Sequence, residues 1–372
     1  MFNNKFEFLD KIYRVSVINL CFFLIGLTPA FAQKFELNTE QSFENSCLNR
    51  EQLEPETQKT VDLLLYVSQT KDCQAANQIL SEVTQLNLRG SQIRDLSPLT
   101  RFSKLEMLSL SGNLISDLSP LSSLNDLKIL VLDVNQIKDL TPLSSLTQLE
   151  ALVLDTNQIE DLTPLAPLTQ LKSLVLYTNQ ISDLTPLQSL VSLKKLSLHG
   201  NQIKDITPLQ NLTRLTYLAL YDNQIQDLSP LANLTNLNQL LLFNNQIRDL
   251  SPLANLTQLN YLSLFTNEIS DLRPLASLTN LTELALGNNP ILDLTPLQGL
   301  KNLKILSLFN TLVSDITPLA DLTNLISLDL YNTEISDSRP LQRLENLTVL
   351  DLRGNPLTEP ACPIKTNLTC RF

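Results

Sequence analysis

The chain has little of what most catalytic sites require. Its 372 residues include one histidine, His199, no tryptophan and only seven glycines, which form no Gly-rich phosphate-binding loop. A single histidine allows no convincing Ser/His/Asp or Cys/His arrangement for nucleophilic catalysis. We therefore expect a protein that is not an enzyme, with no catalytic residues, no cofactor and no bound metal.

Long apolar runs are also scarce, and the clearest one lies near the N-terminus. Three basic residues precede the 13-residue apolar segment 15–27, and residues 30–32 (Ala-Phe-Ala) have the small-x-small pattern of a cleavage site. Such a segment is short for a membrane anchor, which is the competing interpretation. Residues 1–32 are thus predicted to be a secretory signal peptide. The mature chain then starts at Gln33 and does not insert into a membrane.

Basic residues are in the minority. The chain has 27 Lys and Arg against 38 Asp and Glu, and removal of residues 1–32 leaves 24 against 36, a net charge of −12. This charge argues against nucleic acid or an anionic membrane as a partner. We interpret it as a device that keeps a large leucine-rich surface in solution.

What the chain has in abundance is one 22-residue phrase, clearest at residues 127–148 (LKILVLDVNQIKDLTPLSSLTQ). It recurs twelve times between residues 83 and 346 without insertion or deletion. An aspartate and a proline keep this step in all twelve copies, from Asp95 to Asp337 and from Pro98 to Pro340. The pattern L-x-x-L-x-L-x-x-N-x-I at this period is the signature of a leucine-rich-repeat solenoid.

The residues of one copy indicate how the solenoid is built. Leu130 and Leu132 alternate with exposed positions, so they predict a short strand. The amide of Asn135 can donate and accept, and thereby serve backbone groups of its own coil and the next one. We expect residues 139–143 to form a 3-10-like turn on the outer side, because 22 residues leave no room for a full α-helix.

A single copy cannot fold alone. Burying its apolar side chains contributes roughly 2 kcal/mol each, whereas ordering 22 residues costs on the order of 1–2 kcal/mol apiece. The copies must therefore stack, with their strands in a parallel inner sheet. The predicted inward set of this copy is Leu127, Leu130, Leu132, Ile137, Leu140, Leu143 and Leu146.

Two columns of the repeat carry polar side chains with a structural interpretation. The aspartates from Asp95 to Asp337 suggest calcium binding, but each precedes a turn that contains proline, and capping of that turn is the stronger interpretation. The asparagine column is replaced by Thr311 and Thr333 in two late copies. Threonine offers fewer hydrogen bonds, so we predict looser turns there.

The ends of an open solenoid need caps. In residues 33–82, apolar residues at helical spacing predict two helices, one over Pro55–Gln69 and one over Cys73–Val83, as an N-terminal cap. The inward residues expected for these helices are Val61, Leu64, Leu65 and Ser68 in the first, and Ala76, Ile79 and Leu80 in the second. Residues 359–372 are predicted to close the other end.

The mature chain carries four cysteines, namely Cys47, Cys73, Cys362 and Cys370. Stacked strands advance by about 4.8 Å, so twelve coils separate the two ends by roughly 50–60 Å, too far for a disulfide. The geometry leaves the local pairs Cys47–Cys73 and Cys362–Cys370, which fit an oxidising compartment. A metal site is the rival interpretation, but no histidine lies near these cysteines.

The phrase N-x-I-x-D-[LI]-[ST]-P-L-x-x-L resembles the 22-residue repeat of bacterial internalin-type proteins over residues 83–358. The resemblance implies an α/β fold, a right-handed leucine-rich-repeat solenoid of about 12–13 repeats. This solenoid has a parallel inner sheet, short 3-10 outer turns and a helical N-terminal cap. The cysteine-bearing ends depart from the best-known members of that family, so the host-receptor role of those members is not carried over.

One variable column is rich in aromatic residues and follows the strands. Its side chains should face out of the inner sheet, and the exposed column two positions earlier also contains apolar residues. A contiguous exposed apolar patch indicates an interaction site. The alternative is that stacked rings only brace neighbouring strands. The predicted partner-binding residues are Tyr177, His199, Tyr221, Phe243, Phe265, Phe309 and Tyr331, and the earlier column reads Val131, Val153, Val175, Ser197, Ala219, Leu241, Ser263 and Ala285.

These features predict a secreted, periplasmic or cell-surface binding protein whose concave aromatic-lined face holds a protein partner. Glycan binding is a second hypothesis, because sugars stack on aromatic rows and polar side chains adjoin this one. A structural envelope component without a specific ligand is a third. The polar residues in question are Asp222, Asn244, Asn310 and Asn332.

Overall fold

The structure is a computed structural model that describes residues 43–358, 362–363 and 369–372. The predicted signal peptide, its cleavage site and the start of the mature chain lie outside the described residues, as do residues 359–361 and 364–368 of the predicted C-terminal cap. Among the described residues, no helix is long and apolar enough to cross a membrane. The predicted boundaries between caps and solenoid stay predictions.

Helices form the N-terminal end of the described chain. They are α2 (Phe43–Leu48), the 3-10 segment η2 (Arg50–Gln52), α3 (Pro55–Val67) and α4 (Cys73–Glu82). The last two confirm the predicted helices, whereas α2 was not expected. Proline begins α3, and the side chain of Asp72 caps α4 by accepting a 2.7 Å hydrogen bond from the N–H of Ala75.

The predicted inward residues of these helices are buried with one exception. Ala76 and Leu80 of α4 are buried, but Ile79 is 44% exposed, so its assignment to the inner face was wrong. Residues four apart lie above one another on a helix, and the line from Ala76 to Leu80 faces α2 and α3. Ile79 falls to one side of that line.

The helical cap is hydrogen-bonded to the first coil of the solenoid. The hydroxyl of Thr60 donates to the backbone oxygen of Asp95 at 2.7 Å, and the hydroxyl of Thr57 donates to the carboxylate of the same residue at 2.5 Å. The ammonium of Lys59 donates to the backbone oxygen of Gln92 at 2.8 Å. These bonds cover the edge that an open solenoid would otherwise expose.

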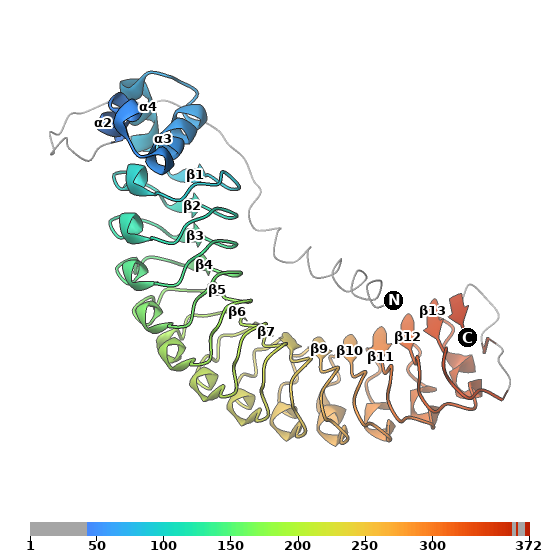
Figure 1. The fold of residues 1–372 in the computed structure, drawn as a ribbon. Coiled ribbons are helices and arrows are strands. Elements are labelled where there is room, and N and C mark those ends of the chain that lie inside the picture. The colour runs from blue at the N-terminus through green and yellow to red at the C-terminus, as the bar shows by residue number, and fades with distance from the viewer. Residues whose placement is uncertain (1–42, 359–361, 364–368) are drawn as a thin grey trace. The chain divides into compact units, whose positions relative to one another are not determined.

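In the described part of the chain, the strands of the solenoid form one 14-stranded parallel sheet, in which every strand pairs with the next one along the chain (Figure 1). Each pairing from β1 to β13 shifts the chain by one repeat, as in Leu108 opposite Leu130, which confirms the predicted register. The last strand, β14, pairs with β13 and was not expected. The strands are β1 (Gln85–Asn87), β2 (Met107–Ser109), β3 (Ile129–Val131), β4 (Ala151–Val153), β5 (Ser173–Val175), β6 (Lys195–Ser197), β7 (Tyr217–Ala219), β8 (Gln239–Leu241), β9 (Tyr261–Ser263), β10 (Glu283–Ala285), β11 (Ile305–Ser307), β12 (Ser327–Asp329), β13 (Val349–Asp351) and β14 (Thr369–Arg371).

Short 3-10 segments return the chain on the side of each coil away from the strands, as predicted (Figure 1). Each contains the repeat proline near its start, where the fixed φ of proline fits. They are η3 (Ser97–Leu99), η4 (Ser119–Leu121), η5 (Thr141–Leu143), η6 (Thr163–Leu165), η7 (Thr185–Ser189), η8 (Thr207–Leu209), η9 (Ser229–Leu231), η10 (Ser251–Leu253), η11 (Arg273–Ser277), η12 (Thr295–Leu297), η13 (Thr317–Leu319) and η14 (Arg339–Arg343).

The repeat aspartates cap these turns. In each of the twelve copies the aspartate Oδ1 accepts a hydrogen bond of 2.8–2.9 Å from the N–H two residues later, as Asp139 does from Thr141. The side-chain and backbone hydrogen bonds of Thr141 lower the pKa of Asp139. The capping interpretation is therefore confirmed.

The core runs along the whole solenoid, and the predicted inward side chains of residues 127–146 are all buried. The side-chain amide of Asn135 donates to the backbone oxygens of Leu132 at 3.0 Å and Leu110 at 3.1 Å, and its Oδ1 accepts from the N–H of Ile115 at 3.0 Å. The side chain of Asn135 thus bonds to its own coil and to the preceding coil, whereas the prediction was its own coil and the following one. The N–H of Ile115 is directed toward the coil after it, where the Oδ1 of Asn135 accepts it.

Both local disulfides are present, which confirms the predicted pairing. Cys47 and Cys73 have their Cα atoms 5.6 Å apart and join α2 to α4. Cys362 and Cys370 have theirs 6.0 Å apart and tie β14 to the preceding loop. Each closes one end of the solenoid.

Candidate interaction surface

Five rings of the predicted column form a continuous stack, which we call the aromatic ladder. Its members are Tyr177, His199, Tyr221, Phe243 and Phe265, one from each of five consecutive coils. Neighbouring centroids are 3.9–4.3 Å apart, and neighbouring planes differ by only 11–16°. The faces of the inner rings therefore contact other rings, and the partial exposure that each ring keeps belongs to its edge.

The ladder follows from the exact repeat length. Because the chain shifts by 22 residues at each pairing, equivalent side chains stand side by side on neighbouring strands. Parallel strands lie about 4.7–4.9 Å apart, so centroids that are closer than this must converge. Figure 1 shows the strands along the inner side of the curved solenoid, and the convergence of the rings indicates that they lie on that side as well.

The column two positions before the ladder is not uniformly exposed, which corrects the prediction. Ser197, Ala219, Leu241 and Ser263 are at most 8% exposed. Val131, Val153 and Val175, which precede this stretch, are only half-buried, as is Ala285 after it. Burial thus coincides with the ladder, whose rings cover the strand residues beside them. The exposed apolar surface is narrower than the sequence suggested.

One of these covered residues is left with an unsatisfied polar group. The hydroxyl of Ser263 is buried and has no hydrogen-bond partner among the described residues. Sequence reasoning had no signal for this, because the serine at the same position three coils earlier does find a partner. Ser197 Oγ lies 3.0 Å from Nδ1 of His199.

The ladder is interrupted at Gly287, which has no ring. The next ring, Phe309, leans across this step: a Cβ at Gly287 would clash with the ring of Phe309. The centroids of Phe265 and Phe309 are 6.2 Å apart, and their planes are 50° apart, in contrast to the parallel rings of the ladder. Beyond it, the guanidinium of Arg353 lies 5.4 Å from the centroid of Tyr331.

Two carboxylates adjoin the N-terminal end of the ladder. Asp155 is 4% exposed, and burial raises its pKa to about 6; a hydrogen bond from Tyr177 opposes this shift, and the charge of Asp133 adds to it. Asp133 accepts a hydrogen bond of 2.8 Å from Ser111. The pKa of the only histidine is shifted in the opposite direction: burial lowers the pKa of His199 to about 3. At neutral pH the ladder is therefore uncharged.

The residue after each ladder position has a left-handed backbone. This column includes the β-branched residues Val134 and Thr156, with φ of 54° and 57°, where such residues are strained. It also contains the polar residues that sequence reasoning assigned to a possible sugar site. Their side chains are hydrogen-bonded in pairs: the amide of Asn244 donates to the carboxylate of Asp222 at 2.6 Å, and the amide of Asn332 donates to the side-chain oxygen of Asn310 at 2.9 Å.

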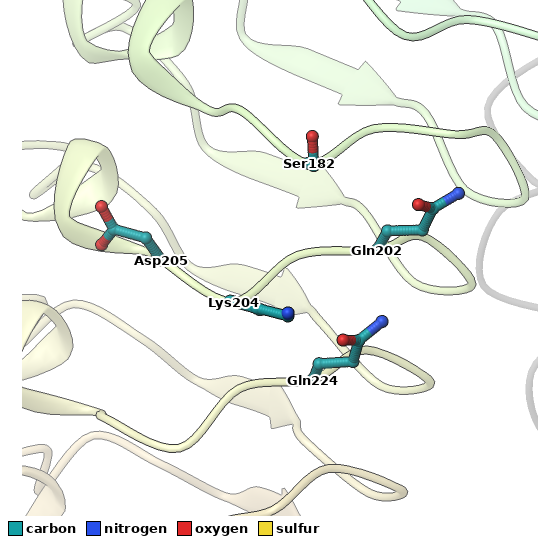
Figure 2. A pocket seen from close by; sticks show the side chains of 5 residues that line it. All are labelled: Ser182, Gln202, Lys204, Asp205 and Gln224. Carbon is teal, nitrogen blue, oxygen red and sulfur yellow. The ribbon is translucent and has the colours of Figure 1, made fainter.

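A hollow of about 320 Å³ lies away from the ladder, on the stretch between the strands and the outer turns (Figure 2). It is lined by Ser182, Gln202, Lys204, Asp205 and Gln224, from three consecutive coils. Asp205 lies at one end and already accepts the N–H of Thr207 at 2.8 Å. The side chains do not converge on one point in Figure 2, so this hollow offers no catalytic arrangement.

Comparison with known proteins agrees with the architecture. The family described as "Leucine Rich repeats (2 copies)" matches residues 81–123, 103–145, 125–167, 191–233, 235–277, 279–321 and 323–364. The crystal structure of internalin InlF from Listeria monocytogenes is similar, with 36% identity and a TM-score of 0.81 over 87% of this chain and 96% of that one. No curated protein sequence matches the chain.

Two further structures share the fold. A leucine-rich-repeat protein of Leptospira interrogans has 26% identity and a TM-score of 0.67 over 79% of this chain and 85% of that one. The plant peptide hormone receptor RGFR1, solved in complex with RGF2, has 21% identity and a TM-score of 0.61 over 74% of this chain and 52% of that one. The chain belongs to the leucine-rich-repeat proteins of bacterial internalin type. Proteins of this type are protein-interaction modules.

Proposed function

We propose that this protein is secreted and holds a protein partner against the concave face of its solenoid, across the aromatic ladder and the neighbouring rings Phe309 and Tyr331. The observation that carries the proposal is a row of aromatic side chains in consecutive coils that stays partly exposed after folding. Aromatic residues are the commonest anchors of protein interfaces, and a partly exposed apolar row of this length is unusual on a surface that only meets water.

Two further observations support the proposal. The disulfides Cys47–Cys73 and Cys362–Cys370 are typical of proteins that leave the reducing cytoplasm. Membership in the internalin type favours binding over catalysis, and the one histidine is stacked between two tyrosine rings.

Glycan binding gains no support from the geometry. Sugars stack on the faces of aromatic rings, but each inner ring of the ladder contacts a neighbouring ring on both faces, at 3.9–4.3 Å between centroids. The amides of Asn244 and Asn332 already bond to side chains of the preceding coil. The inner rings leave only their edges open, and edges suit the irregular apolar surface of a protein better than a sugar ring.

The test uses the chain from Gln33 onward as bait and compares three proteins. The first is unchanged, the second combines Tyr221→Ser, Phe243→Ser and Phe265→Ser, and the third carries Tyr66→Ser, which removes a ring that is 81% exposed on α3. A partner captured by the unchanged protein should bind the triple variant at least roughly thirtyfold more weakly and the Tyr66 variant equally well.

Stability must be measured in parallel, because the three rings also contact one another. We expect the triple variant to melt at a lower temperature, and its affinity should be measured where all three proteins are folded. Equal affinity of the triple variant would remove the ladder from the interface. Capture of a glycan in place of a protein, lost in the same variant, would favour the second hypothesis.

A further inference from the structure

The step at Gly287 differs from every other step beside the ladder. Two steps of the ladder's own spacing would place Phe265 and Phe309 about 8 Å apart, twice the separation of stacked rings. The observed distance is 6.2 Å with planes 50° apart. Phe309 has therefore tilted into a space that would otherwise fit one planar ring.

The tilt depends on the missing side chain. Because a Cβ at Gly287 would clash with Phe309, any other residue at this position would force the ring of Phe309 to move. The contact of Phe309 with Phe265 is also tilted, whereas every contact within the ladder is parallel. The ring of Phe309 thus occupies a position that is open only because Gly287 has no side chain.

We propose that the step at Gly287 is the anchor position of the interface, where an aromatic side chain of the protein partner inserts between Phe265 and Phe309. The inserted ring takes the place that Phe309 occupies over Gly287, Phe309 becomes upright, and the ladder continues through one ring supplied by the partner. This inference rests on the proposed function and specifies the partner chemistry: an exposed Phe, Tyr or Trp side chain.

The slot favours a planar ring over other side chains. A gap of two ring steps has the thickness of one ring with a ring on each face, the arrangement already present along the ladder. Neither Gly287 nor Ala285, two positions before it in the same coil, carries a charged group. A branched aliphatic side chain would not fit between parallel faces, and an ammonium group would lose its hydration there.

The absence of tryptophan from this chain provides a direct assay. N-acetyl-tryptophanamide can be titrated with the unchanged protein and followed by its own fluorescence, which shifts to the blue when the indole leaves water. We expect saturable binding, with nuclear Overhauser contacts from the indole to Phe265 and Phe309. The variant Gly287→Phe places a ring of the chain itself in this step. Its affinity for the probe should be at least roughly tenfold lower than that of the unchanged protein.

Gly299→Phe is the matched control, since a Cβ at Gly299 would meet nothing within 4 Å. It should bind the probe as the unchanged protein does. Equal binding by Gly287→Phe, indole contacts elsewhere on the chain, or no binding up to the solubility of the probe would each overturn the inference. The contact map of the unchanged protein decides the matter even where Gly287→Phe folds poorly.

The outcome is separable from that of the proposed function. If the triple ladder variant loses its protein partner but Gly287→Phe binds that partner unchanged, the anchor is elsewhere and the concave interface stands. If the indole probe binds at Gly287 but the ladder variants keep their partner, the slot exists and the proposed interface fails.

Discussion

The imidazole of His199 and the phenol ring of Tyr221 lie 3.9 Å apart between centroids, with their planes 16° apart. Tyr177 stacks on the opposite side of the imidazole at 4.2 Å, and Ser197 contacts its Nδ1. A histidine held in this way contributes a flat uncharged ring. Its titration should therefore be coupled to folding.

The first prediction concerns His199. Burial lowers its pKa from 6.5 to about 3, so the unfolded chain binds one more proton between these values, and the free energy of unfolding falls as pH decreases below 6.5. His199→Phe keeps a ring but loses this dependence. When the pH is lowered from 7 to 5, the free energy of unfolding measured with urea should fall by roughly 2 kcal/mol more for the unchanged protein than for the variant. If the free energy of unfolding has the same pH dependence in both proteins, the imidazole protonates freely in the ladder and the prediction is wrong. Tyr221→Phe is the control.

Asp155 should show the opposite sign. Burial raises its pKa from 3.8 to about 6, so the folded chain binds more protons between these values, and the free energy of unfolding falls as pH rises through this window. Asp155→Asn removes the penalty, and its stability relative to the unchanged protein should rise by roughly 2.4 kcal/mol between pH 4 and pH 7. Asp139→Asn is the control with reversed sign, because hydrogen bonds lower the pKa of Asp139. A constant difference between Asp155→Asn and the unchanged protein would refute the prediction.

The asparagine column should matter more than the threonines that replace it. Asn289 is 3% exposed, donates to the backbone oxygens of Leu264 and Leu286 at 3.0 and 2.9 Å, and accepts from Ile269. Thr311 donates within its own coil, to Leu308 at 2.8 Å. Asn289→Ala should lower the free energy of unfolding by roughly 1–3 kcal/mol, and Thr311→Ala by about 1 kcal/mol or less. If denaturant unfolding shows equal losses of free energy for the two variants, the hydrogen bonds of Asn289 to the preceding coil add nothing to stability.

Val134 should be replaceable with a gain in stability. Its φ of 54° is unfavourable for a β-branched residue by about 1–2 kcal/mol, and its side chain is 49% exposed, so little packing is lost. After the entropy of glycine in the unfolded chain is subtracted, Val134→Gly should stabilise the protein by about 0.5–1 kcal/mol. Val131→Gly, in the extended strand β3, should destabilise it. A lower melting temperature for Val134→Gly would contradict the prediction.

The disulfides should protect the ends selectively. The bond Cys47–Cys73 spans 26 residues and Cys362–Cys370 spans 8, so loss of the first should cost roughly 1 kcal/mol more. Replacing both members of one pair by serine should accelerate hydrogen exchange in the adjoining cap and first coils, because each coil contacts only its neighbours. Uniform acceleration along the whole solenoid would refute this local picture. Non-reducing peptide mapping of exported protein checks the pairing itself.

The repeat made much of the fold predictable. A period of 22 residues without insertions is a translation from one coil to the next, so strand register, the inward leucines, the capping aspartates and the local pairing of cysteines all follow from position along the chain. Each of these features depends only on a residue and its equivalents in neighbouring coils. Helix α2 and the bonds from Thr57 and Thr60 to Asp95 were missed, because the cap lies outside the period.

The aromatic column was visible in the sequence, but its arrangement was not. Whether rings splay or stack depends on the curvature that brings them closer than the strands, and on which rotamers their neighbours leave open. Stacking in turn buries Leu241 and leaves the hydroxyl of Ser263 unpaired, so the exposed surface is reduced to ring edges. At Gly287 the sequence shows only a missing side chain. The tilt of Phe309 into that step depends on how the neighbouring rings pack in three dimensions.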